Sequence, residues 1–148
     1  MKNIRLVLLL LATVILVAGC AGGPQYSALH STEGPIPPGD GRIYVYRKAV
    51  LGAAVQPAVK VNDETVGNAV PQGYFFIDRP AGNYKISTTT EVTRSASLVL
   101  EPGQERYVRL NMAMGFFVGH VWPELIENEK AEKDIKDCHF TGKTGSLP

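Results

Sequence analysis

The sequence predicts a mainly all-β protein: an antiparallel β-sandwich of about seven short strands with a short C-terminal helix, spanning residues 41–140. Two observations carry this prediction. Short runs rich in β-branched and aromatic residues are separated by turn signals at near-regular spacing. Within these runs apolar and polar side chains alternate, which indicates sheets with one buried face each. The chain of 148 residues has an ordinary globular composition and length for one domain.

The runs with strand character follow one another along the chain. Residues 42–47 come first, with Ile43 and Val45 on one face and Tyr44 and Tyr46 on the other. Turn signals such as Pro102-Gly103 close the runs. The other runs are residues 58–62, 65–67, 74–78, 84–90, 96–101 and 105–112, with two further short runs at 116–121 and 124–126 around Pro123.

The C-terminal piece has helical rather than strand periodicity. Asn128 is the expected N-cap. Ala131, Ile135 and Cys138 follow at positions i, i+4 and i+7, so they share one helix face. This face predicts a short helix laid against the sandwich, with Cys138 as a buried thiol. Residues 141–148 are expected to form a flexible tail.

The N-terminus has the layout of a secretory signal. Lys2 and Arg5 precede an apolar run, which ends in small residues and then Cys20. This arrangement resembles the signal of bacterial lipoproteins. The resemblance implies cleavage between Gly19 and Cys20 and attachment of diacylglycerol, with palmitate-type chains, to the Cys20 thiol. The alternative, an uncleaved membrane span, is disfavoured because residues 6–18 are shorter than the roughly 20 residues that cross a bilayer.

Cleavage would leave a mature chain anchored in the cell envelope. Removing residues 1–19 takes away two basic residues and no acidic one, so the net charge falls from +1 to −1. A near-neutral chain without a basic cluster excludes nucleic acid as a partner. In a host with two membranes, Ala21 resembles the residue after the cysteine in lipoproteins sent to the outer membrane, where the domain would face the periplasm. Residues 20–40, rich in Pro and Gly, predict a tether of at most about 65 Å, with His30 solvated.

Two further resemblances concern the domain itself. The strings Arg42–Arg47, Gly73-Tyr74-Phe75, Pro80-Ala81-Gly82 and Gly115–Gly119 resemble a family of small bacterial lipoproteins of unknown function. Val66-Gly67, Pro80-Ala81-Gly82-Asn83-Tyr84 and Pro102-Gly103 resemble the turn pattern of the PEGA-type surface module, a small β-sandwich. These motifs imply architecture, and the resemblance brings no activity with it.

Residues capable of chemistry are sparse. No metalloprotease, nucleophile-elbow or dinucleotide-binding motif is present, so we expect no enzyme activity, no cofactor and no metal. Cys138, His139 and His120 could form a three-ligand metal site only if the fold brought them together. Cys138 lacks a second cysteine if Cys20 carries lipid, which leaves a buried thiol, a free thiol or an intermolecular disulfide as alternatives.

The aromatic residues opposite the aliphatic stripes form the candidate binding face. Aligned on adjacent strands they could form a flat platform for a sugar ring or a partner protein. The alternative is that they stack on one another or lie under the helix. The sequence thus predicts a non-catalytic interaction module for another envelope protein, or alternatively a binder of peptidoglycan glycan or peptide. The residues of the expected face are Tyr44, Tyr46, Tyr74, Phe76 and Tyr107.

Overall fold

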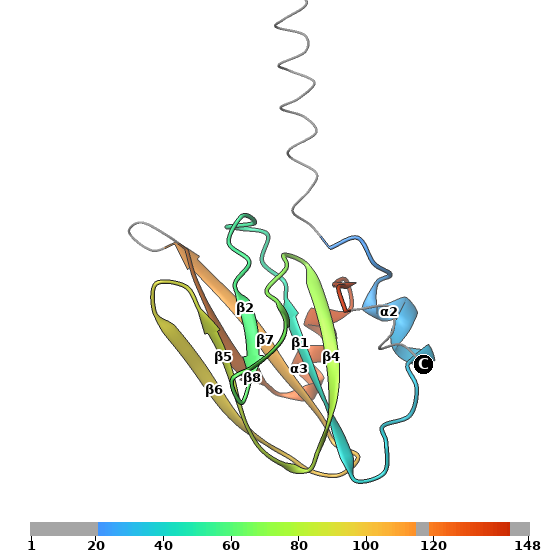
Figure 1. Ribbon diagram of the computed structural model, residues 1–148. Coiled ribbons are helices and arrows are strands. Elements are labelled where there is room, and N and C mark those ends of the chain that lie inside the picture. The colour runs from blue at the N-terminus through green and yellow to red at the C-terminus, as the bar shows by residue number, and fades with distance from the viewer. Residues whose placement is uncertain (1–20, 115–118, 143–148) are drawn as a thin grey trace, which may run out of the picture.

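Two packed sheets form the body of the molecule (Figure 1). The computed structural model describes residues 21–114 and 119–142. One sheet has five strands in the order β8-β7-β1-β4-β9, and the other has four in the order β3-β2-β5-β6. The predicted β-sandwich with a C-terminal helix is confirmed, with nine strands in the described residues. The elements are α2 (Tyr26–Leu29), η1 (His30–Thr32), β1 (Asp40–Arg47), β2 (Ala58–Val61), β3 (Glu64–Asn68), β4 (Gly73–Pro80), β5 (Gly82–Thr89), β6 (Thr93–Leu100), β7 (Glu105–Met114), β8 (Gly119–Ile126), α3 (Asn128–Ile135) and β9 (His139–Phe140).

The two sheets differ in strand direction. All pairs in the four-stranded sheet are antiparallel. The five-stranded sheet is mixed, because β1 runs parallel to β7 and β4 runs parallel to β9. The purely antiparallel prediction is therefore wrong for these two pairs. Alternation of side chains is the same in parallel and antiparallel strands, so it carries no information on which distant strands become neighbours.

Turn chemistry explains where several strands end. Asn62 and Asp63 have φ angles of 46° and 69° and join β2 to β3. This is the two-residue hairpin loop that Asn and Asp favour. Strand β8 passes through Pro123 without a break, whereas the sequence predicted two strands around it. An edge strand tolerates proline because its outer N–H has no partner to lose. Residues 116–118 of the predicted strand lie outside the described residues.

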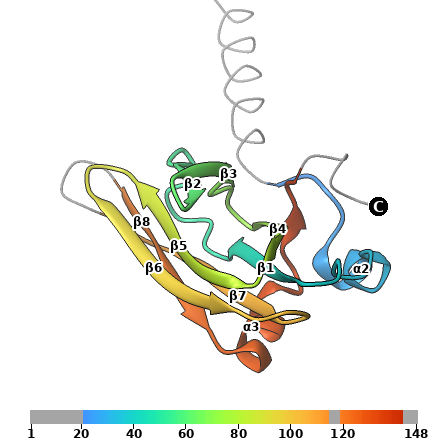
Figure 2. The same ribbon diagram turned by 60° about the horizontal axis from the view of Figure 1, so that its bottom comes forward.

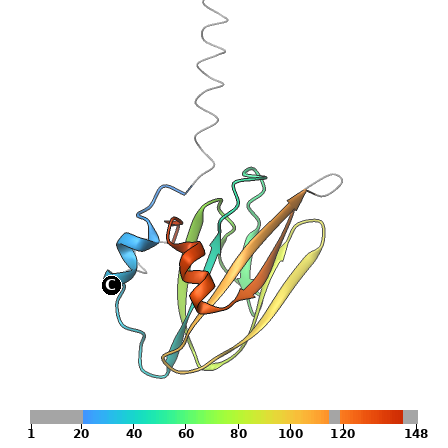
Figure 3. The same cartoon turned by 180° about the vertical axis from the view of Figure 1, so that it is seen from behind.

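The molecule has two apolar clusters, one on each face of the five-stranded sheet. The first fills the space between the sheets and contains Ile43, Val45 and Val108. The second lies on the opposite face of the same sheet, beneath α2 and α3, and includes Phe140 of the edge strand β9. Figures 2 and 3 show these C-terminal and N-terminal elements gathered on that outer side. The five-stranded sheet is thus buried on both faces.

Helix α3 covers part of the second face as predicted. Ala131, Ile135 and Cys138 are all buried. The helix begins at Asn128, and Glu127 rather than Asn128 is its N-cap. Asp134 accepts hydrogen bonds from Lys48 (3.0 Å) and Arg109 (3.1 Å), which fasten the helix to the end of β1 and to β7.

The segment after residue 20 is not a free tether, which corrects the prediction for residues 21–33. The Tyr26 backbone N–H donates to Cys138 O (2.9 Å), and the Phe140 N–H donates to Pro24 O (2.8 Å). The Tyr26 side chain is 5% exposed. We call residues 21–33 the docked segment. The glycines and prolines of this segment favoured the prediction of a tether, whereas the segment contains a short helical turn in which Tyr26 is buried.

The predicted signal peptide, with Gly19 and Cys20, lies outside the described residues, as do residues 143–148 of the predicted tail. Thr141 is held by β4, because its N–H and hydroxyl both donate to Tyr74 O. Among the described helices, none is long and apolar enough to cross a membrane.

Candidate interaction site: the docked N-terminal segment

The five predicted aromatic residues do come together on one face of the five-stranded sheet. Tyr44 lies opposite Phe76 and Tyr46 lies opposite Tyr74 in the β1–β4 pair. Tyr44 also lies beside Tyr107 in the parallel β1–β7 pair. Their exposed fractions are only 0–7%, so the prediction of an exposed platform is wrong. The aromatic face is covered, which is the alternative in which these rings stack beneath other elements.

The docked segment supplies one of the rings that cover this face. The Tyr26 ring meets the Tyr44 and Tyr74 rings edge-on, with centroids 5.7 and 5.3 Å away. His30 stacks on Tyr26 at 4.5 Å, and Tyr44 stacks on Tyr107 at 4.8 Å. Edge-to-face and offset contacts at these distances are favourable beyond the area they bury.

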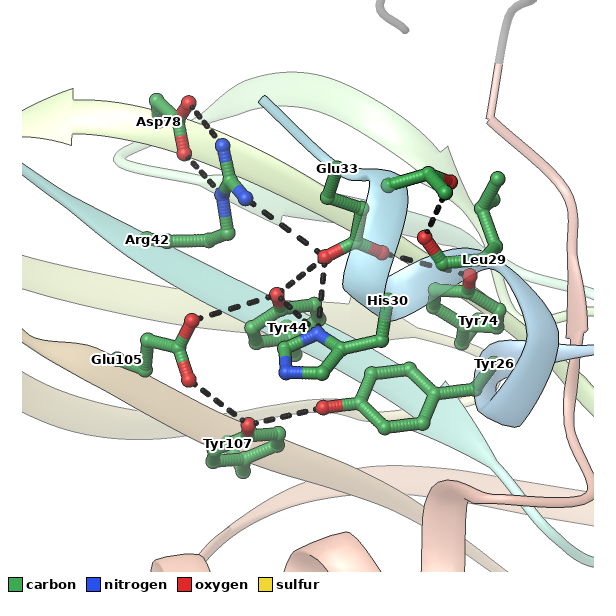
Figure 4. A network of polar contacts seen from close by, with 11 residues as sticks. Tyr26, Leu29, His30, Glu33, Arg42, Tyr44, Tyr74, Asp78, Glu105 and Tyr107 are labelled. Carbon is green, nitrogen blue, oxygen red and sulfur yellow. Dashed lines mark hydrogen bonds and ion pairs between the residues drawn. The ribbon is translucent and has the colours of Figure 1, made fainter. Parts of the chain in front are cut away.

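Glu33 is the polar centre of the site (Figure 4). Its side chain is 1% exposed. The Tyr44 hydroxyl donates to Glu33 Oε2 at 2.5 Å, and His30 Nδ1 lies 3.1 Å from the same oxygen. The Tyr74 hydroxyl approaches Oε1 at 3.5 Å. A buried carboxylate must be paired and hydrogen-bonded to be tolerated, so Glu33 holds the docked segment to two sheet tyrosines at once.

Arg42 supplies the positive charge beside Glu33. Its guanidinium binds Asp78 through two hydrogen bonds of 2.7 and 2.8 Å, and its Nη1 lies 3.6 Å from Glu33 Oε2. It also lies over the Phe76 ring, 4.3 Å from the centroid. The hydrogen bonds that Arg42 donates to the Asp78 carboxylate raise the pKa of Arg42 above its usual range. This fork of charge-assisted bonds is the geometry that arginine makes with carboxylates.

A second carboxylate extends the network toward β7. The Tyr107 hydroxyl donates to Glu105 Oε2 (3.1 Å) and lies 3.1 Å from the Tyr26 hydroxyl. Burial raises the pKa of Tyr26, Tyr44 and Tyr107 well above the usual range. These phenols therefore keep their protons at an alkaline pH where an exposed tyrosine would ionise. The arrangement fastens the docked segment to the sheet through hydrogen-bond donors that keep their protons.

Comparison with known proteins places the chain among proteins without an assigned activity. Residues 37–121, more than half of the chain, match the family described as "Protein of unknown function (DUF2846)". The chain belongs to this family. A protein from Haemophilus influenzae, named only as an uncharacterized protein, is 27% identical over 136 residues, covering 88% of this chain and 81% of that protein. No solved structure matches the chain.

The family match begins at residue 37 and so leaves out the docked segment, whereas β1 to β7 lie inside it. Of the side chains around Glu33, the sheet tyrosines and Arg42 belong to the DUF2846 region. Tyr26, His30 and Glu33 precede it. The family match thus covers strands β1 to β7 and the start of β8, and the docked segment, α3 and β9 lie outside it.

The cysteine and histidines that could have formed a metal site are dispersed. The His139 Nδ1 contacts Gly23 O (2.7 Å), and His120 lies 3.7 Å from Glu91. Cys138 is 2% exposed, and burial raises the pKa of its thiol to about 12. Over residues 21–114 and 119–142, no three His, Cys, Asp or Glu side chains are grouped to hold a metal. Cys138 is a buried free thiol in the fold.

The sequence interpretation missed Tyr26, His30 and Glu33. The signal that could have found them is local: Tyr26, Leu29 and Glu33 fall at i, i+3 and i+7, one face of a helical turn. A run of four residues is too short to stand out against the surrounding glycines and prolines. Tyr44, the buried hydrogen-bond partner of Glu33, lies on strand β1. Spacing along the chain gives no information about which residues of the segment contact that strand.

A surface groove of about 430 Å³ offers a different kind of site. It opens beside β5 and β6 and is lined by Tyr84, Lys85, Leu98 and Arg106 among others, with no carboxylate, cysteine or histidine. Apolar surface with two cations suits binding of an acidic or amphipathic group. The lining contains no pair of groups for general acid–base chemistry.

Proposed function

We propose that this protein is a lipid-anchored, non-catalytic interaction module of the bacterial envelope, attached through Cys20. The observation that carries the proposal is the docked segment. Residue 21, the first after the expected lipidation site, is already part of the domain, because the Ala21 N–H donates to Pro71 O (3.3 Å). An anchor at Cys20 would therefore hold the sandwich directly against the membrane.

The N-terminal sequence supports the anchor. The basic start, the short apolar run and the small residues before Cys20 follow the lipoprotein pattern. Two or three acyl chains would give stable attachment, whereas one chain alone is marginal. In a host with two membranes, Ala21 favours the outer membrane with the domain in the periplasm. The PEGA-like turn pattern supports a surface β-module.

The proposed interaction role rests on the groove at the surface of the sandwich. Burial of the tyrosine face removes the surface through which peptidoglycan binding was expected. The groove with Lys85 and Arg106 lies in the exposed part of the sandwich and suits an acidic side chain or chain terminus of another envelope protein. We assign the partner contact to this groove.

Metabolic labelling with an alkyne analogue of palmitate tests the anchor. The chain offers a matched control, since it has two cysteines. The wild type and Cys138→Ala should carry the label, and Cys20→Ala should lose both the label and its membrane association. A label retained by Cys20→Ala, or absent from the wild type, would contradict lipid anchoring through this residue.

Photo-crosslinking from the anchored protein tests the partner contact. A crosslinker at Lys85 should yield a discrete adduct with one envelope protein. The same group at Glu129, an exposed residue on α3, should not. Adducts with muropeptides would contradict a protein partner and favour wall binding. Equal adducts at both positions, or none at Lys85, would contradict the groove as the contact.

A further inference from the structure

Exposed large apolar side chains gather at one end of the sandwich. Four of the five such residues in the described chain lie in the loop after β1, in the turn that joins β5 to β6, and at the end of β7. Scattered exposed apolar residues are normal on a soluble surface, but a concentration of them marks an interaction site. The four are Val50 (48% exposed), Leu51 (60%), Val92 (55%) and Met114 (66%); the fifth, Val99 (57%), lies near the other end of β6.

Strand register places these loops at the end from which the chain leads to Cys20. Arg47 pairs with Gly73, so the loop after β1 and the loop before β4 share one end of the sheet. Ala21 is bonded to Pro71 in that second loop. Strand β7 runs parallel to β1 and ends at Met114, at the same end. Figure 1 shows the start of the docked segment, in blue, at this end.

The loop carrying Val50 and Leu51 is built to present them outward. Arg47 is fully buried, and its guanidinium donates to the carbonyl oxygens of Leu51 (2.7 Å), Gly52 (3.0 Å) and Val55 (2.7 Å) in the loop. It also donates to Ala69 O (2.8 Å) in the neighbouring loop. The backbone carbonyls face inward onto one cation, while the side chain of Leu51 remains exposed.

The loops at this end also pack on one another. A Cβ at Gly52 or at Gly119 would lie about 2 Å from the Met112 methyl group, so both backbones press on the same side chain. Glu91, in the β5–β6 turn, pairs with His120 of β8 at 3.7 Å. The apolar residues thus project from one connected surface.

The opposite end differs in chemistry. Its turns read Pro80-Ala81-Gly82-Asn83 and Glu101-Pro102-Gly103-Gln104. We propose that the apolar end is a membrane-resting surface, in which Val50, Leu51, Val92 and Met114 contact the lipid bilayer. This rests on the proposed anchor at Cys20.

A bilayer fits this end better than a protein partner because of where the chain leaves. An acyl anchor one residue before Ala21 would place membrane beside Pro71 and the adjoining loops. Tethering raises the effective concentration of the surface at the membrane, so a few apolar side chains suffice to bias the orientation. Amphipathic surfaces bury such side chains at the boundary between headgroups and acyl chains. The face of the sandwich that carries the groove beside β5 and β6 would then remain free for the partner protein.

Depth-dependent fluorescence quenching on the anchored full chain tests this orientation. Leu51→Cys and Val99→Cys, which have nearly equal exposure, would each carry an environment-sensitive dye, with Met114→Cys as a second tip position. The wild type, with its buried Cys138, gives the labelling background. In membranes containing nitroxide-labelled phospholipid, the dye at Leu51 and at Met114 should be quenched several-fold more than the dye at Val99.

Equal quenching at Leu51 and Val99 would overturn the proposal. Shielding of the Leu51 dye from iodide without lipid quenching would also overturn it, because a protein partner or a second copy would then cover the tip. The intact mass of the same preparation reports anchoring separately. A protein without acyl groups contradicts the proposed anchor, whereas an acylated protein with equal quenching contradicts only the membrane-resting surface.

Discussion

The hydroxyl groups of Tyr26 and Tyr107 lie 3.1 Å apart, although the two residues are separated by 81 positions in the chain. Tyr26 belongs to the docked segment and Tyr107 to β7, an inner strand of the five-stranded sheet. Their contact joins the docked segment to the aromatic face, another part of which is covered by α3. The segment next to the expected lipid anchor is therefore joined to the core of the five-stranded sheet.

Truncation of Tyr26 should release the docked segment. Tyr26→Ala removes a buried ring and should lower the free energy of unfolding by about 3 kcal/mol. Tyr26→Phe keeps the ring and should cost about 1 kcal/mol, because only the hydroxyl contact is lost. Urea denaturation followed by circular dichroism measures both. Equal effects of the two substitutions would show that the hydroxyl, rather than the ring, accounts for the contribution of Tyr26 to the free energy of unfolding.

Removal of the Glu33 charge should weaken the same contact. Glu33→Gln replaces the acceptor shared by Tyr44 and His30 and leaves Arg42 with Asp78 alone. We expect a loss of about 2 kcal/mol, the scale of a hydrogen bond to a charged group. Glu101→Gln, at an exposed position, is the control and should change stability by less than about 0.5 kcal/mol. Similar losses in both variants would contradict the central place of Glu33.

The Arg47 guanidinium should not be replaceable by lysine. A single ammonium group cannot reproduce four hydrogen bonds spread over two loops. Arg47→Lys should therefore destabilise the protein by about 3 kcal/mol and raise amide hydrogen exchange in residues 48–57. Arg94→Lys, at an exposed site, should leave both quantities unchanged. An unaltered exchange pattern in Arg47→Lys would show that the loop does not depend on it.

Stability should fall steeply at high pH. Burial raises the pKa of Tyr26, Tyr44, Tyr46, Tyr74 and Tyr107 above the value of 10. The pKa of each of these tyrosines is higher in the folded protein than in the unfolded chain. The free energy of unfolding therefore stays at its full value below pH 10 and falls as the pH rises above it. Each tyrosine lowers the free energy of unfolding by about 1.4 kcal/mol per pH unit above that point.

Absorbance of phenolate together with circular dichroism checks this dependence. Ionisation of the five tyrosines should coincide with loss of the β signal in one cooperative step. Tyr44→Phe should reduce the absorbance change of that step by one tyrosine. Gradual ionisation of these groups near pH 10 with an intact fold would contradict their burial.

Local patterns were enough to predict most of the strands. The alternation of Ile43 and Val45 with Tyr44 and Tyr46 identified β1 and both of its faces. It could not show that both faces are buried, because a covered aromatic face and an exposed one have the same spacing. The parallel pairing of β1 with β7 depends on a connection of more than 50 residues and has no local signal.

The sequence predicted the sheet residues of the candidate site but not the segment that covers them. The tyrosines on β1, β4 and β7 were grouped correctly because alternation on neighbouring strands brings them to one face. Their cover was missed because Tyr26 and Glu33 lie among glycines and prolines, a composition that favours a flexible linker. Contacts over such sequence distances arise from tertiary packing, which outweighs local propensity.

Hydrogen–deuterium exchange on residues 22–36 of the membrane-anchored protein tests the central claim most directly. The account predicts that the backbone amides of Tyr26, Ser27 and Glu33 exchange slowly, because they donate to Cys138, Lys136 and Leu29 carbonyls in the folded domain. Tyr26→Ala should remove this protection without unfolding the sandwich strands. Exchange of these amides in the wild type at the rate of an unstructured chain would contradict the docked segment and restore a free tether.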